Sequence, residues 1–160
     1  MLDHPDQIAR FDPQGLGRLL EQFPAQCREG FALAARLASF PRSIRAVVVA
    51  GMGGSAISGD LISSVLAQSV TLPFHVVRGY DCPAWVGAES LVVAVSYSGQ
   101  TEETLSVFQQ AVERNATLAA ITSGGTLAQE AEHRGIPLVT IPKGLPPRSA
   151  LGYLLFPLLR

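Results

Sequence analysis

Five short runs of aliphatic residues recur along this sequence, and segments that read as helices follow most of them. The first run, 46–50, reads Ala-Val-Val-Val-Ala without any alternation of polar and apolar residues, which is typical of a strand buried on both faces. The remaining runs lie at 74–77, 91–95, 117–121 and 137–141. Strands that alternate with helices over short connections are parallel and joined by right-handed crossovers. The sequence therefore predicts an α/β fold with a doubly wound five-stranded parallel sheet and helices on both faces.

Helices are expected between these strands and at both ends of the chain. The segments that read as helices are 55–67, 102–114, 126–133 and 149–159. Two more helices are expected before the first strand, and Pro24 begins the second of them because proline is tolerated in a first helical turn. The expected organisation is a helical N-terminal segment, residues 1–45, followed by one sheet domain, residues 46–160.

The composition limits the classes of partner. Hydrophobic residues make up 48% of the chain and charged residues 16%, and the formal net charge is −1. These values are typical of a globular protein, and there is no basic stripe to neutralise nucleic-acid phosphates. The N-terminus lacks the basic start and apolar core of a signal peptide, and no apolar run approaches the ~20 residues of a membrane span. We expect a cytoplasmic protein that binds neither nucleic acid nor membrane.

The two cysteines, Cys27 and Cys82, lie far apart and belong to no cluster of cysteine and histidine. This spacing excludes a disulfide framework and a structural zinc site, and it fits a reducing compartment. We expect neither a metal nor a cofactor.

The loop after the first strand, 51–56, reads Gly-Met-Gly-Gly-Ser-Ala. Glycines allow a ligand to approach the backbone, and the helix that follows presents unpaired N–H groups and the positive end of its dipole. A single glycine would indicate only a tight turn, but three glycines and a serine in five residues favour an anion site. Gly53, Gly54 and Ser55 are therefore candidate phosphate-binding residues.

The loop after the third strand, 96–101, reads Ser-Tyr-Ser-Gly-Gln-Thr. Its three hydroxyls can donate hydrogen bonds to phosphate oxygens without adding positive charge. Helix capping by Ser98 or Thr101 is the alternative, but capping requires one hydroxyl rather than three. Ligands of doubly wound sheets bind at the carboxyl ends of the strands, where the strand order reverses. Ser96, Ser98 and Thr101 are therefore predicted to share a phosphate site with the first loop.

Together, the Gly-x-Gly-Gly-Ser and Ser-Tyr-Ser-Gly-Gln-Thr motifs resemble the sugar isomerase (SIS) domain. The segment 145–153, Leu-Pro-Pro-Arg-Ser-Ala-Leu-Gly-Tyr, is similar to that of the bifunctional phosphoglucose/phosphomannose isomerases. The resemblance covers nearly the whole chain and corresponds to the N-terminal half of such an enzyme. It implies that the phosphate of a hexose 6-phosphate is held by Ser55, Ser96, Ser98 and Thr101, with backbone help from Gly53 and Gly54.

The resemblance also implies that Arg148 stabilises the anionic enediolate during aldose–ketose isomerisation. Two prolines stiffen the backbone before Arg148, and a cationic donor placed where an oxyanion develops lowers the barrier. A surface arginine that caps a carbonyl is the plainer interpretation of the same residue.

Isomerisation also requires a base and a ring-opening acid. In the resembled family a second SIS domain supplies them, so a second SIS domain or another subunit, in a homodimer, is an expected partner. Within this chain, Glu102 and Glu103 are interpreted as first-turn helix residues, and Glu130 and Glu132 as a solvated helix face. His4, His75 and His133 receive no catalytic role, and the apolar segment 149–159 is expected to need a partner that buries it.

Two other functions stay open at this stage. Gly51-x-Gly53-x-x-Ala56 also fits a dinucleotide fingerprint, in which Arg78 would meet a 2′-phosphate of NADP, but the hydroxyl loop is then unexplained. A non-catalytic module that senses a sugar phosphate would explain the absent base and acid, but it does not require Arg148.

Overall fold

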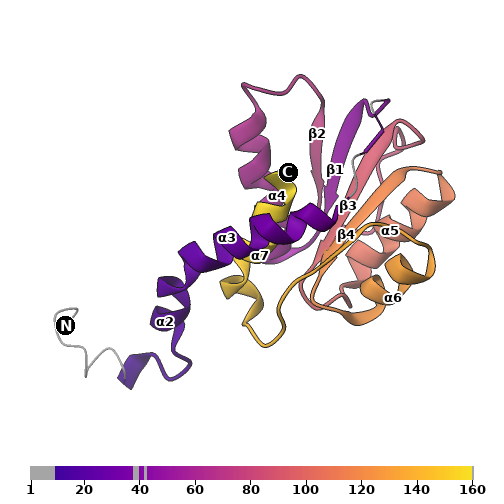
Figure 1. Ribbon diagram of the computed structural model, residues 1–160. Helices are drawn as coiled ribbons and strands as arrows, with labels where there is room; N and C mark the ends of the chain where they lie inside the picture. Colours follow the sequence, from indigo (N-terminus) through magenta and orange to yellow (C-terminus); the bar gives the residue numbers. More distant parts are fainter. Residues whose placement is uncertain (1–9, 38–39, 42, 160) are drawn as a thin grey trace.

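The structure, a computed structural model, describes residues 10–37, 40–41 and 43–159. A five-stranded sheet lies at its centre in the order β2-β1-β3-β4-β5, and every neighbouring pair is parallel (Figure 1). The strands are β1 Ala46–Ala50, β2 Phe74–Val77, β3 Ser90–Ser96, β4 Thr117–Thr122 and β5 Leu138–Thr140. The predicted fold is confirmed, and the strand bounds agree with the sequence patterns to within one residue.

Helices cover both faces of the sheet because successive strand residues point to opposite sides. On one face Val48, Val92 and Ala120 pack with residues of α5 (Glu102–Glu113) and α6 (Gly125–His133). On the other face strand residues pack with α7 (Leu151–Leu155), which contacts α3 (Phe23–Leu33) and α4 (Gly53–Leu66). The central strands read as continuous apolar runs because each of their faces is covered.

The N-terminal helices begin close to where the sequence predicts them. Pro24 is the second residue of α3, a position where its missing N–H costs no helical hydrogen bond. A short 3-10 helix, η1 (Ala34–Arg36), continues α3. The preceding helix, α2 (Leu16–Glu21), has no buried residue and extends away from the sheet (Figure 1).

The C-terminal segment is not the single helix that we predicted for 149–159. It consists of a 3-10 helix η2 (Pro147–Ser149), the five-residue α7 and a second 3-10 helix η3 (Phe156–Leu159). Pro157 has no N–H to donate, and its ring clashes with the preceding turn, so the α-helical ladder ends at Leu155.

The apolar C-terminal segment finds most of its burial within the chain. Tyr153 and Leu154 are buried between the sheet and α3. Helices α3 and α7 approach closely because a glycine of one faces a glycine of the other: a Cβ on Gly30 would lie 2.7 Å from the carbonyl oxygen of Gly152. A partner outside the chain is therefore not needed to explain why this segment is apolar.

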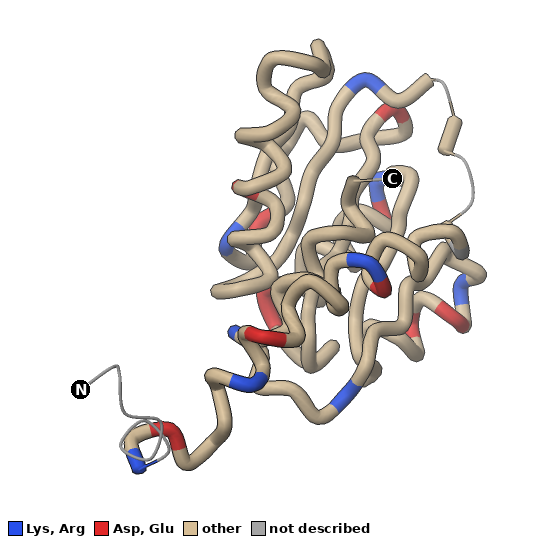
Figure 2. The backbone as a smooth tube through the Cα atoms, turned by 60° about the vertical axis from the view of Figure 1, so that its left-hand side comes forward, with Lys and Arg blue, Asp and Glu red and all other residues tan. Residues whose placement is uncertain are grey.

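The surface carries few charges. Figure 2 shows the lysine, arginine, aspartate and glutamate positions scattered along the described chain rather than gathered into one basic stripe. No helix in the described ranges is both long enough and apolar enough to span a bilayer.

Candidate functional site

The two loops predicted to bind phosphate follow the neighbouring strands β1 and β3, at the point where the strand order of the sheet reverses. β1 and β3 are neighbours, but α4 leaves β1 toward one face and α5 leaves β3 toward the other. A crevice therefore opens between the two loops at the carboxyl ends of these strands, which is where doubly wound folds bind ligands. At its base lies Gly51, where a Cβ would stand only 2.9 Å from the carbonyl oxygen of Val95.

The first loop leaves the N-terminus of α4 without a side-chain cap. Met52 is in extended conformation at the N-cap and its side chain makes no capping bond, while its carbonyl oxygen accepts from the N–H groups of Ser55 and Ala56. Gly53 has a φ of 49° and open space around it, so the backbone here is accessible. Ser55 is largely buried, yet no group in the described part of the chain hydrogen-bonds its hydroxyl. The loop thus offers free donors at a helix N-terminus, as predicted.

The second loop is organised by its own hydroxyls. The Oγ of Ser96 lies 2.8 Å from Oγ1 of Thr101 and accepts a 3.1 Å hydrogen bond from the N–H of Gly99. The Oγ of Ser98 accepts from the N–H of Gln100 at 3.2 Å. Thr101 occupies the N-cap position of α5, but its side chain makes no capping bond. The capping interpretation is therefore wrong for Thr101, because its hydroxyl faces Ser96 instead of the helix.

A third loop, between β4 and α6, supports the second and was missed by the sequence analysis. Its Gly124 and Gly125 pack directly against Gly99: a Cβ on Gly99 would lie 1.8 Å from the carbonyl oxygen of Gly124. The N–H of Leu127 donates to the carbonyl oxygen of Gly99 at 3.0 Å, and the Ser123 hydroxyl donates to the backbone carbonyl oxygen of Tyr97 at 2.7 Å. The Ser-Gly-Gly sequence directly after the fourth strand is the signal that would have indicated this turn.

The tyrosine of the second loop holds the chain that follows β5. The Tyr97 hydroxyl donates to the carbonyl of Pro142 at 3.1 Å and accepts from the N–H of Leu145 at 2.8 Å. The segment between these two contacts includes Lys143. Its Cε and Nζ both lie 3.1 Å from the position of a Cβ on Gly124. The structure therefore places a lysine beside the loop that supports the hydroxyl cluster.

The backbone of Arg148 lies near the loop that follows β1. The residue belongs to η2, it is exposed, and a Cβ on Gly54 would lie 3.9 Å from the Cα of Arg148. The backbone of Arg148 thus packs beside the first turn of α4. In residues 10–37, 40–41 and 43–159 the two ion pairs involve other cations, so the guanidinium of Arg148 has no carboxylate partner there.

The carboxylates that the sequence analysis considered lie on α5 and α6. Glu102 and Glu103 are in the first turn of α5, and an oxygen of Glu102 accepts a 3.3 Å bond from the hydroxyl of Tyr80. The negative charges of Glu103 and Glu102 raise the pKa of Tyr80. Glu130 forms an exposed pair with Arg134 on α6, which fits its interpretation as a solvated helix residue.

The histidines are not brought to the site. His75 lies in β2 with its ring edge-on to Trp85, and His133 is the last residue of α6. His4 lies outside the described residues. Among those described, no group of three His, Cys, Asp or Glu side chains is placed to hold a metal ion. Burial raises the pKa of the Cys27 and Cys82 thiols.

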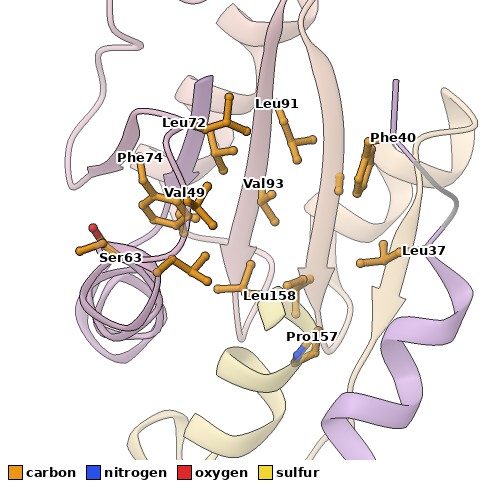
Figure 3. A pocket seen from close by; sticks show the side chains of 16 residues that line it. Leu37, Phe40, Val49, Ser63, Leu72, Phe74, Leu91, Val93, Pro157 and Leu158 are labelled. Atoms are coloured by element: carbon orange, nitrogen blue, oxygen red, sulfur yellow. The ribbon is translucent and has the colours of Figure 1, made fainter. Parts of the chain in front are cut away.

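An apolar cavity of about 380 Å³ lies elsewhere, on the sheet face that packs with α7 (Figure 3). Val49, Phe74 and Leu91 line it together with Leu158, and among the described residues that line it only Ser63 is polar. Such a lining offers almost no hydrogen bonds to a phosphorylated sugar. The candidate site is therefore the polar region at the carboxyl ends of β1 and β3, where the two loops lie.

A doubly wound sheet with uncapped helix N-termini and a hydroxyl-lined loop at its switch point defines the class of α/β domains that bind anionic ligands. The family model described as the SIS domain matches residues 42–143, so the chain belongs to the SIS domain family.

The chain resembles metabolic enzymes with this domain. It is 50% identical over 113 residues to a bifunctional phosphoglucose/phosphomannose isomerase of Caldicellulosiruptor bescii, a match that covers 71% of this chain and 33% of that protein. It is 36% identical over 111 residues to a D-glucosamine-6-phosphate 4-epimerase of Sulfolobus acidocaldarius, covering 69% and 35% of the two chains. The chain thus spans about a third of the length of these curated relatives.

Solved structures share the fold at lower identity. The tagatose-6-phosphate ketose/aldose isomerase of Escherichia coli superposes with a TM-score of 0.65 and 20% identity, over 86% of this chain and 45% of that one. This likeness concerns the arrangement of strands and helices.

Proposed function

We propose that this chain is the hexose 6-phosphate-binding N-terminal half of an aldose–ketose phosphosugar isomerase. The substrates would be glucose 6-phosphate or mannose 6-phosphate, and the product fructose 6-phosphate. One observation carries the proposal: the uncapped N-termini of α4 and α5 flank the same crevice, with the hydroxyl cluster of the second loop between them. A phosphate there would receive backbone and hydroxyl donors together with two helix dipoles.

The hydroxyls of the second loop are arranged to donate outward. Ser96 already accepts from the N–H of Gly99, so its own proton is free to donate to Thr101. The proton of Thr101 is then available to a phosphate oxygen, and so is that of Ser98, whose oxygen accepts from Gln100. Ser96 would therefore act mainly by orienting Thr101, while Ser55, Ser98 and Thr101 contact the phosphate with the N–H groups of Gly53 and Gly54.

Arg148 would stabilise the intermediate. In the isomerisation a base removes the proton from C2 of the open-chain aldose, the electron pair moves toward the carbonyl, and an enediolate forms. The proton then returns to C1, and the C2 oxygen becomes the new carbonyl. The backbone of Arg148 lies beside the first turn of α4, and its guanidinium has no carboxylate partner in the described ranges. A cation carried at this position suits the developing oxyanion.

The base and the ring-opening acid would come from a second SIS domain, in a homodimer. The curated relatives are about three times as long as the region they share with this chain, which leaves room for such a domain. Glu102 and Glu103 stand in the first turn of α5, beside the proposed phosphate position rather than beside C1 and C2 of the sugar. They would repel the phosphate of the substrate and are therefore poor candidates for the base.

Binding of fructose 6-phosphate tests the proposal. Titration calorimetry and thermal unfolding would be measured with fructose 6-phosphate, and with fructose and NADP as controls. We expect stabilisation by the sugar phosphate alone, of about 2.7 kcal/mol at a ligand concentration one hundred times Kd. Ser55→Ala should weaken binding about tenfold, since a hydrogen bond to a charged group contributes about 1.5–3 kcal/mol.

Ser64→Ala is the matched control. Ser64 lies on the same helix, but it is exposed and its hydroxyl bonds only to the carbonyl of Asp60. Stabilisation by NADP without any by fructose 6-phosphate would overturn the proposal in favour of a dinucleotide site. Arg78, which that alternative needs for a 2′-phosphate, is already paired with Asp60. An isomerase assay on the same sample separates an enzyme from a sugar-phosphate sensor.

A further inference from the structure

Lys143 is the only lysine of the chain: the sequence holds eleven arginines and one lysine, which together make its twelve cationic residues. The two side chains are not equivalent. A lysine ammonium is a compact point charge on a flexible stem, whereas arginine presents a wide planar fork. A lysine at position 143 is therefore suited to an interaction that needs a small, mobile positive charge.

The side chain of Lys143 lies over the loop that supports the second loop. Its Cε and Nζ are each 3.1 Å from where a Cβ on Gly124 would be, so the absence of that Cβ gives the side chain its place. The carbonyl of Gly124 in turn packs against Gly99, at the centre of the hydroxyl loop. One glycine thus separates the ammonium group from the loop proposed to hold phosphate.

The backbone around Lys143 is anchored from the same loop. The hydroxyl of Tyr97 bonds the carbonyl of Pro142 on one side and the N–H of Leu145 on the other. The motif that carries the hydroxyls therefore also fixes the segment that carries the lysine. A chance surface lysine would not require two such contacts from one motif residue.

The charges near the crevice indicate a role for Lys143. Hydroxyls and backbone amides bear no net charge, and the first turn of α5 carries Glu102 and Glu103. Arg148 stands on the opposite side, beside α4. In the described ranges the two ion pairs are Arg78–Asp60 and Arg134–Glu130, so no carboxylate there neutralises Lys143.

We propose that Lys143 is an anion-binding residue of this site, which supplies the positive charge on the α5 side for the phosphate dianion of the substrate. The inference rests on the proposed function and adds a residue to it. When a phosphorylated ligand occupies the crevice, the flexible side chain reaches across Gly124 toward the phosphate oxygens. The uncharged donors then set the position of the phosphate, and Lys143 offsets the repulsion from the two glutamates.

Charge replacement tests this role. The Kd for fructose 6-phosphate would be measured by calorimetry at low and high salt for the unmodified chain, Lys143→Gln, Lys143→Arg and Arg134→Gln. We expect Lys143→Gln to weaken binding about 5- to 10-fold at low salt, between the effect of an exposed ion pair and that of a charge-assisted hydrogen bond. The difference should shrink at high salt because exposed charges are screened.

The controls separate this charge from net charge in general. Arg134→Gln removes one positive charge from the exposed surface of α6, so its Kd should stay within about twofold. Lys143→Arg should keep more of the affinity than Lys143→Gln because the charge remains, but less than the unmodified chain because the wide guanidinium fork does not replace a compact ammonium. If the unmodified chain binds and Lys143→Gln binds within twofold of it at both salt concentrations, the role of Lys143 is refuted and the proposed function stands. If the unmodified chain does not bind, the proposed function itself fails.

The single lysine allows a second readout without mutation. Acylation by an amine-reactive ester, followed by mass spectrometry of the peptide that contains Lys143, reports on this side chain alone. We expect fructose 6-phosphate to slow the acylation of Lys143 several-fold and fructose to have no effect. Equal rates with both ligands, in a chain that binds fructose 6-phosphate, would overturn the inference.

Discussion

Replacing Gly99 with alanine probes the contact between the second loop and the β4–α6 turn. Gly99 has a φ of 68°, and an added Cβ would lie 1.8 Å from the carbonyl oxygen of Gly124. Both atoms belong to backbone or to Cβ, so no side-chain rotation relieves the overlap, and one of the two loops must move by about 1 Å or more. That movement disrupts the hydrogen bond from the N–H of Leu127 to the carbonyl of Gly99.

The cost has two parts. A left-handed backbone costs an alanine about 1–2 kcal/mol, and forcing extra volume into a packed contact costs about 1–3 kcal/mol. We expect Gly99→Ala to lower the free energy of unfolding by about 2–5 kcal/mol and Tm by about 4–20 °C. Because the displaced loop carries Ser98 and precedes Thr101, affinity for fructose 6-phosphate should fall at least tenfold.

Urea unfolding, thermal unfolding and calorimetry measure these effects. Gly79→Ala is the matched control, since a Cβ there has no atom within 4 Å and the backbone is not left-handed. The control should change stability by less than about 0.5 kcal/mol. If Gly99→Ala unfolds at the same urea concentration as Gly79→Ala and binds the ligand equally well, then the close contact of the two loops does not position the site.

Two further predictions concern the N-terminal side of the fold. Gly152→Ala would place a Cβ 2.7 Å from the Cβ of Gln26 and separate α3 from α7; the free energy of unfolding should fall by about 1–3 kcal/mol, and an unchanged urea midpoint would contradict the packing argument. Burial and the hydrogen bond to Glu29 raise the pKa of Tyr153 to about 12. Since the folded pKa exceeds the ordinary tyrosine pKa of 10, this contribution to stability is present below pH 10 and lost as the pH rises toward 12. Urea midpoints should therefore fall more steeply above pH 10 in the unmodified chain than in Tyr153→Phe, and parallel pH profiles would refute the linkage.

The sequence predicted the sheet, and it placed the candidate phosphate loops directly after two of the strands, because both features are local patterns. A run such as Ala46–Ala50 is apolar at every position, since helices cover both faces of the strand. The glycines and hydroxyls of the two loops follow such strands directly. Strand order then brings the loop at 51–56 and the loop at 96–101 together.

The roles of individual side chains were harder to predict. We predicted Ser96 as a phosphate contact; in the structure its hydroxyl is buried and hydrogen-bonds to Thr101 and Gly99, and we propose that it orients Thr101. The choice between capping and binding for Thr101 depends on which way its side chain turns. The partner that sets this direction is Ser96, five residues earlier in the sequence. The two residues are joined by a turn whose conformation cannot be read from residue propensities.

The sequence alone determined the alternation of strands and helices, the uncharged hydroxyl loop and the single lysine, because these are properties of neighbouring residues. Only the tertiary structure decided that Gly124 must lack a side chain, that Tyr97 anchors the loop of Lys143, and that α3 buries the C-terminal segment. Each of these depends on segments at least nineteen residues apart that meet when the sheet forms. Such contacts arise from chain packing, which residue patterns within one helix or loop do not encode.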